Sequence, residues 1–265
     1  MPATYAHYVF GKKVFKKLPK GEKEIICEAK DAFLLGLHGP DLLFYYYPLC
    51  RNRINQQGYS MHKEIAADFF EKGKKLYEQE KNLILRAYLY GFLCHYILDS
   101  ECHPYINFYM DENDCGHLEL ETEFDRYLME LDGYDPLEYV PVRHLISRRS
   151  TREQIARMFE DVTERQIHTA IQMFRSTIKA FVCKNPVKRM VLKNVSRLTG
   201  QDQKLGGLLM DGRVNLVCED SDWFLEERLE RAVETAVEEL VYYSYILDKG
   251  GVLSERMYRD YNEIS

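Results

Sequence analysis

Five potential metal ligands lie within residues 93–121, LCHYILDSECHPYINFYMDENDCGHLELE. His95, Asp99 and His103 follow one another at four-residue steps, and His117 and Glu121 repeat the step. Side chains four residues apart lie on one face of an α-helix, one turn apart, so each pair can direct two ligand atoms at a common ion. The spacing therefore predicts helices that bind metal.

Apolar and aromatic residues surround these ligands, which indicates that the ligating face lies inside the protein. The neighbours are Leu93, Tyr96, Ile97, Leu98, Tyr105, Phe108 and Tyr109. A carboxylate or imidazole in a core costs several kcal/mol unless it is hydrogen-bonded or bound to a metal. One such pair is ordinary on a helix surface, but two groups together favour a zinc site. Because Pro104 disfavours helical geometry at the residue before it, we expect the first helix to end at His103.

Helical periodicity extends along most of the chain, with apolar residues at intervals of three and four and few strand patterns. The sequence therefore predicts an all-α fold: one helical domain over residues 1–265, with a metal cleft built from helices in the N-terminal half and a C-terminal helical part over residues 150–265. The expected helices cover residues 5–17, 22–37, 61–76, 82–99, 118–131, 152–182 and 223–247.

Three segments between these helices have a different composition. Polar residues 50–59 predict a mobile flap, and residues 133–141 predict a loop. Residues 185–212 are basic and contain glycine, so we expect a loop-rich excursion with a solvated basic face. Trp223, the only tryptophan, is expected to pack on the body of the fold.

Composition and charge limit the classes of partner. The chain has 265 residues, 46% of them hydrophobic, which is enough for a substantial core. With 36 basic and 42 acidic residues the net charge is −6. This charge argues against nucleic acid as a partner and against docking on an anionic membrane by a basic surface.

The first residues, MPATYAHYVFGKKVFKK, lack the apolar run of a signal peptide, and no later segment approaches the roughly 18–20 apolar residues of a membrane span. The seven cysteines include no CxxC pair, and we expect them to be reduced. Cys94, Cys102 and Cys115 flank the ligands and are expected to pack as small buried side chains. The sequence thus predicts a cytoplasmic protein without a transmembrane segment.

Other ligand-type residues lie outside the opening stretch. Asp41 follows a Gly-Pro turn and by itself suits a turn or helix N-cap. His38 could reach the cleft, but turn packing is an equal alternative. His144 and His168 lie in charged surroundings and are expected to face solvent. None of these three histidines is assigned to a metal.

Taken in order, the ligand-type residues resemble the ligand series of the zinc-dependent phospholipase C family. The motifs are YAH at His7, GPD at Asp41, MH at His62, HYILD at His95 to Asp99, HP at His103, and HLELE at His117 to Glu121. The resemblance covers residue 2 to about residue 130, and the pattern HxxxD…HP…HxxxE is its most specific part.

The resemblance implies three zinc ions in one cleft of an all-helical protein. It assigns His7 and Asp99 to the first ion and His103, His117 and Glu121 to the third. The second ion takes Asp41, His62, His95 and Asp99, with Asp99 bridging the first two ions. The implied reaction is cleavage of a phosphodiester bond by a metal-bridging hydroxide, with Asp41 as a base that orients the attacking water.

The first zinc site has a further requirement at the N-terminus. Secreted relatives supply the amino group and carbonyl of an N-terminal tryptophan to this ion, whereas this chain begins with Met1 and Pro2. We expect removal of Met1, after which Pro2 supplies its amine and carbonyl. If this site does not form, two zinc ions are expected instead of three.

The expected substrate is a phospholipid or a related headgroup ester, and more broadly a small-molecule or lipid phosphodiester. A cytoplasmic enzyme does not meet extracellular phosphatidylcholine, so the family name alone does not identify the substrate. The aromatic residues 44–47 could contact a quaternary amine through cation–π interactions or could belong to the core. Transient contact with a membrane surface is compatible with a lipid substrate.

Other functions remain open at this point. A related nuclease family shares the ligand order with aspartate as the last ligand, so single-strand nuclease-like or phosphomonoester hydrolysis is an alternative, although Glu121 favours the phospholipase. A second alternative is a helical metal-binding protein that has lost turnover. A di-iron bundle needs Glu-x-x-His motifs that are absent at these positions. The adjacent His-Asp doublet of another class of metal-dependent phosphohydrolases does not occur in the chain.

Overall fold

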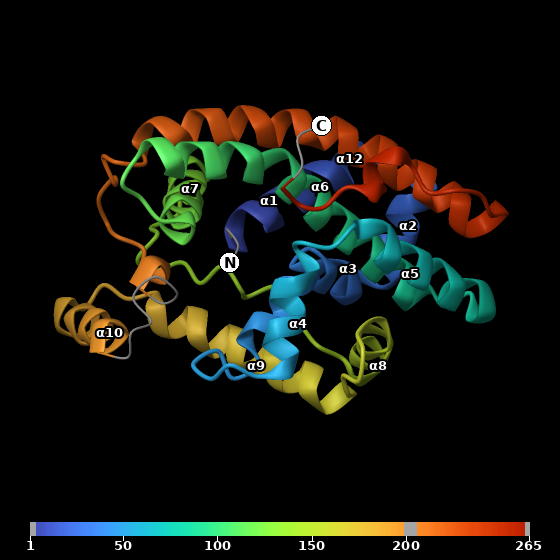
Figure 1. The fold of residues 1–265 in the computed structure, drawn as a ribbon, viewed down its shortest axis with the longest axis horizontal. Coiled ribbons are helices and arrows are strands. Elements are labelled where there is room, and N and C mark those ends of the chain that lie inside the picture. The colour runs from blue at the N-terminus through green and yellow to red at the C-terminus, as the bar shows by residue number, and fades with distance from the viewer. Residues whose placement is uncertain (1–3, 199–205, 263–265) are drawn as a thin grey trace.

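The computed structural model describes residues 4–198 and 206–262, and over these residues it contains helices and no strand (Figure 1). This confirms the predicted all-α fold. The elements in order are α1 (Thr4–Lys17), α2 (Lys20–Glu28), α3 (Lys30–Gly36), η1 (Gly39–Tyr45), α4 (Arg53–Met61), α5 (Ala66–Glu80), α6 (Leu83–Glu112), α7 (His117–Leu131), α8 (Arg149–Met158), α9 (Glu164–Phe181), α10 (Pro186–Leu198), η2 (Gly206–Leu208), α12 (Glu219–Lys249) and η3 (Glu255–Tyr258).

Helix α6 is the centre of the molecule. Asn82 caps its N-terminus by accepting hydrogen bonds from the backbone amides of Ile84 and Leu85. Residues 85–100 are all buried, and α1, α3, α7, α8 and α12 all pack against this helix. Figure 1 shows α12 running along α6 and α7 at the top of the molecule. A helix covered on every side explains why residues 85–98 are almost uniformly apolar or aromatic.

The crossing of α3 and α6 is unusually close because a glycine lies on each helix. A Cβ atom on Gly91 would lie 2.1 Å from the carbonyl oxygen of Phe33, and one on Gly36 would lie 2.3 Å from that of Tyr88. The two backbones are therefore in direct contact. Since η1 follows α3 within three residues, this contact also brings η1 against the middle of α6.

The predicted end of the first metal-binding helix at His103 is wrong. Helix α6 continues through Pro104 to Glu112. A proline inside a helix removes one backbone hydrogen bond and costs about 3 kcal/mol. Burial of His103 and Ile106 on either side of it offsets this cost. As a result, Asp99 and His103 remain one turn apart on a single helix.

Two of the long helices predicted from periodicity are each divided in the structure. Residues 22–37 form α2 and α3, with a break at Ala29. Residues 152–182 form α8 and α9, because Asp161 adopts a left-handed φ of 49° and Thr163 caps α9. Both breaks keep the apolar stripe facing the core, which is why periodicity alone did not reveal them.

The region around His62 also differs from the prediction. Residues 50–59 do not form a flap, because Asn52 and Asn55 form a capping box that starts α4 at Arg53. His62 is therefore the C-terminal cap of α4, not a first-turn residue of the next helix, which begins at Ala66.

Two predictions for the C-terminal part also need correction. The segment 185–212 is not mainly a loop, because it contains the 13-residue helix α10. Residues 199–205 of that segment lie outside the described residues. Trp223 does not pack on the body of the fold, since 61% of it is exposed at the start of α12.

Candidate metal centre

Five elements contribute the eight described ligand-type residues. Helix α6 supplies three of them from consecutive turns, and α7 supplies two from one face. The residues are His7 on α1, Asp41 on η1, His62 at the end of α4, His95, Asp99 and His103 on α6, and His117 and Glu121 on α7. They form three groups whose ligand atoms lie within 4.8 Å of one another in each group. Pro2 lies outside the described residues.

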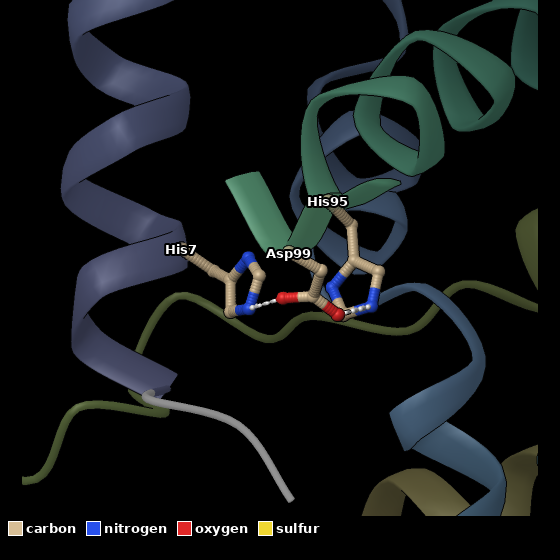
Figure 2. A group of neighbouring side chains, drawn as sticks. All are labelled: His7, His95 and Asp99. Atoms are coloured by element: carbon tan, nitrogen blue, oxygen red, sulfur yellow. Dashed lines mark ion pairs between the residues drawn. The ribbon is translucent and has the colours of Figure 1, made fainter. Parts of the chain in front are cut away.

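Asp99 lies between two histidines (Figure 2). Its Oδ1 atom lies 3.2 Å from His7 Nε2, and its Oδ2 atom lies 3.0 Å from His95 Nε2. The two imidazole rings stack with centroids 4.4 Å apart. The two oxygens of one carboxylate thus face different histidines, which is the arrangement that a carboxylate bridging two metal ions requires.

A second group forms around Asp41. His62 Nε2 lies 3.1 Å from Asp41 Oδ1 and 3.7 Å from Asp99 Oδ2, and His95 Nε2 lies 3.7 Å from Asp41 Oδ2. Gly39 makes this approach possible, because it has a left-handed φ of 46° and a Cβ there would lie 2.2 Å from His95 Cδ2. Asp41 is therefore a buried neighbour of His62 and His95 and not a solvated turn residue.

The third group joins the C-terminal half of α6 to the first turns of α7. His117 Nε2 lies 3.0 Å from Glu121 Oε1, and His103 Nε2 lies 3.7 Å from the same oxygen. His103 Nε2 also lies 3.6 Å from Asp99 Oδ1, so the third group adjoins the first. All three groups therefore belong to one continuous site.

Hydrogen bonds from the outer ring nitrogens orient two of the histidines. His95 Nδ1 lies 3.3 Å from the carbonyl oxygen of Leu37, and His62 Nδ1 lies 2.9 Å from that of Gly58. A carbonyl accepts a hydrogen bond only from a protonated nitrogen, so Nδ1 carries a proton and Nε2 is the atom that faces the other ligand-type residues. Metal-ligating histidines are usually held in this way.

The buried oxygens of Asp41 provide a test of whether the site suits a metal. Only 1% of Asp41 is exposed, yet neither of its oxygens accepts a hydrogen bond of good geometry from the described residues. Burying a carboxylate in this state is costly unless a cation neutralises it. Nitrogen and carboxylate oxygen ligands in groups of three also match the preferences of zinc. The residues present therefore fit zinc.

The electrostatics of the site favour the charged forms of Asp99 and Glu121. Burial opposes the charged form of Asp99, but the imidazoles of His95, His103 and His7 outweigh it and hold the pKa of Asp99 well below its usual value. In the same way His117 and His103 lower the pKa of Glu121 against burial. Burial lowers the pKa of His95, which favours the neutral imidazole that a metal needs.

Asp125 on α7 fixes the helix that carries His7. Its oxygens accept hydrogen bonds from the backbone amides of Tyr5 at 2.8 Å and Ala6 at 2.7 Å. These amides belong to the first turn of α1, where a helix has no internal acceptors for them. Burial raises the pKa of Asp125 to about 7, although both amide hydrogen bonds lower it.

Sequence reasoning missed a histidine pair behind the site. His144 was expected in solvent, but its ring stacks on Tyr8 at 4.3 Å, and its Nε2 lies 3.1 Å from His38 Nε2. Burial lowers the pKa of both, that of His144 to about 4, so one neutral ring donates to the other. His38 is fully buried, as turn packing requires, while His168 is exposed as expected.

Tyr261 is a further residue that no sequence signal identified. This fully buried side chain comes from the C-terminal segment, and its ring lies 4.8 Å from His62 and 6.1 Å from His95. Of the aromatic residues 44–47, Phe44 and Tyr45 are buried and belong to the core, whereas 51% of Tyr47 is exposed. Phe44 stacks on both Tyr59 and His62.

Residues 6–177 match the family model described as zinc dependent phospholipase C. The chain belongs to this family. The family match contains the eight ligand-type residues and ends within α9, so α10 and α12 lie beyond it. No curated protein and no solved structure matches the chain. None of the described helices combines the length and apolar character that crossing a membrane requires.

Proposed function

We propose that the protein is a zinc-dependent hydrolase that cleaves a phosphodiester bond, with a phospholipid or a related headgroup ester as substrate. The observation that carries the proposal is the position of Asp99, whose two oxygens face His7 on one side and His95 on the other. Family membership supports zinc as the metal and a phospholipase C type of reaction.

The proposed ligand sets follow the two oxygens of Asp99. His7 and Asp99 would hold the first ion, together with the amine and carbonyl of Pro2 after removal of Met1. Asp99 would also join the second set, which is Asp41, His62 and His95. His103, His117 and Glu121 would hold the third ion.

The site has an open edge, as a catalytic metal site needs. The side chains of His117 and His62 are 29% and 16% exposed, whereas those of His7, His95 and Asp99 are almost completely buried. Substrate therefore enters beside His62 and His117. Tyr59 and Phe44 stack beside His62, and the half-buried Tyr59 ring is suited to contact a headgroup amine.

Zinc, when bound, lowers the pKa of water and stabilises negative charge on phosphate oxygens. Asp41 orients the attacking water and accepts its proton at a carboxylate oxygen. The water oxygen forms a bond to phosphorus, and the P–O bond to the alcohol breaks. The leaving alkoxide takes up a proton from solvent water, and Asp41 releases the proton that it accepted to solvent. The Nδ1 atoms of His95 and His62 face backbone carbonyls, which leaves their Nε2 atoms directed at the metal-binding residues.

The direct test is headgroup release from a phospholipid by zinc-loaded protein, measured as phosphomonoester in the water phase. His95→Ala should abolish release, and the matched control His168→Ala, a substitution on the exposed face of α9, should leave it unchanged. Nucleotide release from single-stranded DNA without headgroup release would assign the protein to the nuclease alternative. Bound zinc with neither activity would favour the non-enzymatic alternative.

A further inference from the structure

Helix α10 presents its apolar face to solvent. Val187, Met190 and Val191 are 62%, 57% and 50% exposed. Residues at positions i, i+3 and i+4 share one face of a helix, so these three side chains form a single stripe. An ordinary surface helix turns such a stripe toward the core, whereas this one turns it outward.

The opposite face of α10 is the one that contacts the protein. Arg189 donates hydrogen bonds to the carbonyl oxygens of Met210, at 2.7 Å, and Cys183, at 3.4 Å, and pairs with Asp211 at 3.3 Å. Leu192, three residues further, is half-buried on the same side. These contacts fix the helix so that its apolar stripe faces away from the body, and Figure 1 shows α10 at the periphery of the molecule.

Charge on α10 is opposite to that of the chain as a whole. Residues 184–197 contain five basic residues and no acidic residue, in a chain with a net charge of −6. Lys188 and Lys193 are both exposed. With 100° of rotation per residue, they lie on opposite sides of the apolar stripe, about 110° from its centre. The net charge of the whole chain argued against an anionic partner, because a sum over all residues does not show that basic residues are concentrated in this segment.

We propose that α10 docks on a membrane surface that contains anionic lipid, with Val187, Met190 and Val191 entering the interface. An apolar stripe flanked by lysines is the arrangement of helices that lie in the plane of a membrane. The lysine stems extend along the apolar layer while their ammonium groups reach the lipid phosphates. This inference goes beyond the proposed function, because it concerns a surface outside the family match and does not depend on the metal centre.

The segment that follows α10 contacts the helix that carries His117. Residues 207–210 follow the helix along the chain, and a Cβ on Gly207 would lie 3.0 Å from Leu118, the neighbour of His117. The excursion that carries α10 thus packs on the first turn of α7. A membrane bound at α10 is thereby linked to α7, the helix that carries the partly exposed His117.

The test is co-sedimentation of the full-length protein with vesicles of phosphatidylcholine alone or mixed with phosphatidylserine, at low and high salt. Binding should require phosphatidylserine and weaken at high salt. Met190→Ser/Val191→Ser should lower the partition constant by about tenfold or more. Lys188→Gln/Lys193→Gln should lower it by roughly tenfold and remove the preference for anionic lipid.

The matched control is Leu83→Ser/Val252→Ser, which removes two exposed apolar side chains, 40% and 69% exposed, at the first residue of α6 and just after the C-terminal end of α12. It should bind like the unmodified protein, and so should His95→Ala, which separates docking from the metal centre. Absence of vesicle binding at low salt, or equal binding by the Met190→Ser/Val191→Ser variant, overturns the proposal. Binding to calcium-loaded calmodulin without vesicle binding would also overturn it in favour of a protein partner.

Discussion

Asp99 Oδ1 lies 3.2 Å from His7 Nε2, although the two residues are on different helices and 92 positions apart in the chain. The other oxygen of Asp99 faces His95 on its own helix. In the proposed ligand sets Asp99 is therefore shared by the first two ions. Loss of its charge should affect both groups, whereas a change at Glu121 should affect only the third.

Asp99→Asn should reduce bound zinc from the proposed three ions per chain to about one, because the amide keeps the shape but removes the charge that the first two proposed sites share. Glu121→Gln should leave about two ions, since His7, Asp41 and the other ligands of the first two sites are unchanged. The measurement is zinc per chain by plasma mass spectrometry on protein purified without chelators. His168→Ala, on an exposed surface, serves as the control and should retain all the zinc.

Equal loss of zinc in Asp99→Asn and Glu121→Gln would show that the three sites bind cooperatively and would contradict separate ligand sets. About two ions in the unmodified protein would indicate that the first site lacks its terminal ligand. In that case intact-mass measurement of Met1 removal would separate a retained Met1 from a processed Pro2 that does not bind.

The contact between α3 and α6 predicts a large effect of a small substitution. Gly91→Ala should destabilise the protein by roughly 3 kcal/mol or more, because its Cβ would lie 2.1 Å from the backbone oxygen of Phe33, which cannot move without shifting α3. The measurement is the free energy of unfolding in urea. Since α3 leads into η1, the same variant should also weaken zinc binding at Asp41.

Gly21→Ala is the matched control for that substitution. Gly21 lies in α2, and a Cβ there would meet no atom within 4 Å. Alanine is favoured over glycine in a helix by about 1 kcal/mol, so this variant should be slightly more stable than the unmodified protein. A neutral Gly91→Ala variant would mean that α3 and α6 can separate at no cost, and would contradict the close crossing.

The histidine pair behind the site gives a separate prediction. His144→Ala should destabilise the protein by about 2–3 kcal/mol, because it removes the stack on Tyr8 and leaves His38 buried without the hydrogen bond from its Nε2. Thermal unfolding of zinc-free protein measures the effect on folding alone. His168→Ala should change stability by less than about 0.5 kcal/mol, and an equally small effect of His144→Ala would show that the pair is not stabilising.

Much of the fold was predictable from the sequence because helix periodicity is local. The apolar pattern identified α1, α6, α7 and α12 to within a few residues, except for the C-terminal end of α6. The local sequence pattern does not show where tertiary packing overrides a local preference for ending or continuing a helix. Pro104 remains inside α6 because the residues on both sides are buried, and the break at Asp161 preserves the apolar stripe of the helices that it separates.

The candidate site was predictable where its residues follow one helix and unpredictable where they meet across helices. The four-residue steps from His95 to His103 identified one face of α6. By contrast, Tyr261 reaches His62 from near the C-terminus, and His144 reaches His38 across 106 positions. Neither residue lies in a motif, so only the folded chain brings them to the site. The inverted apolar face of α10 was hidden for the same reason, since it depends on which side of the helix contacts the protein.

The buried carboxyl of Asp125 predicts how stability depends on pH. Its pKa is about 7 in the folded protein and about 3.9 in an unfolded chain, so the folded state binds a proton more tightly. Because the pKa of Asp125 is raised in the folded protein, this residue contributes most favourably to the free energy of unfolding at low pH. Between about pH 4 and pH 7 the unfolded state loses this proton first, so the contribution of Asp125 to the free energy of unfolding should fall as pH rises, by up to about 1.4 kcal/mol per pH unit.

Asp125→Asn isolates this contribution, because asparagine does not titrate. The difference in the free energy of unfolding between zinc-free unmodified protein and the variant, measured in urea at several pH values, should shift in favour of the variant as pH rises from 4 to 7. Above pH 7 the difference should become constant. A difference that shifts in favour of the unmodified protein over this range would show that Asp125 is charged in the folded state, held by the amides of Tyr5 and Ala6. The amides in the first turn of α1 would then donate to a charged carboxylate, and the position of His7 would not depend on pH near neutrality.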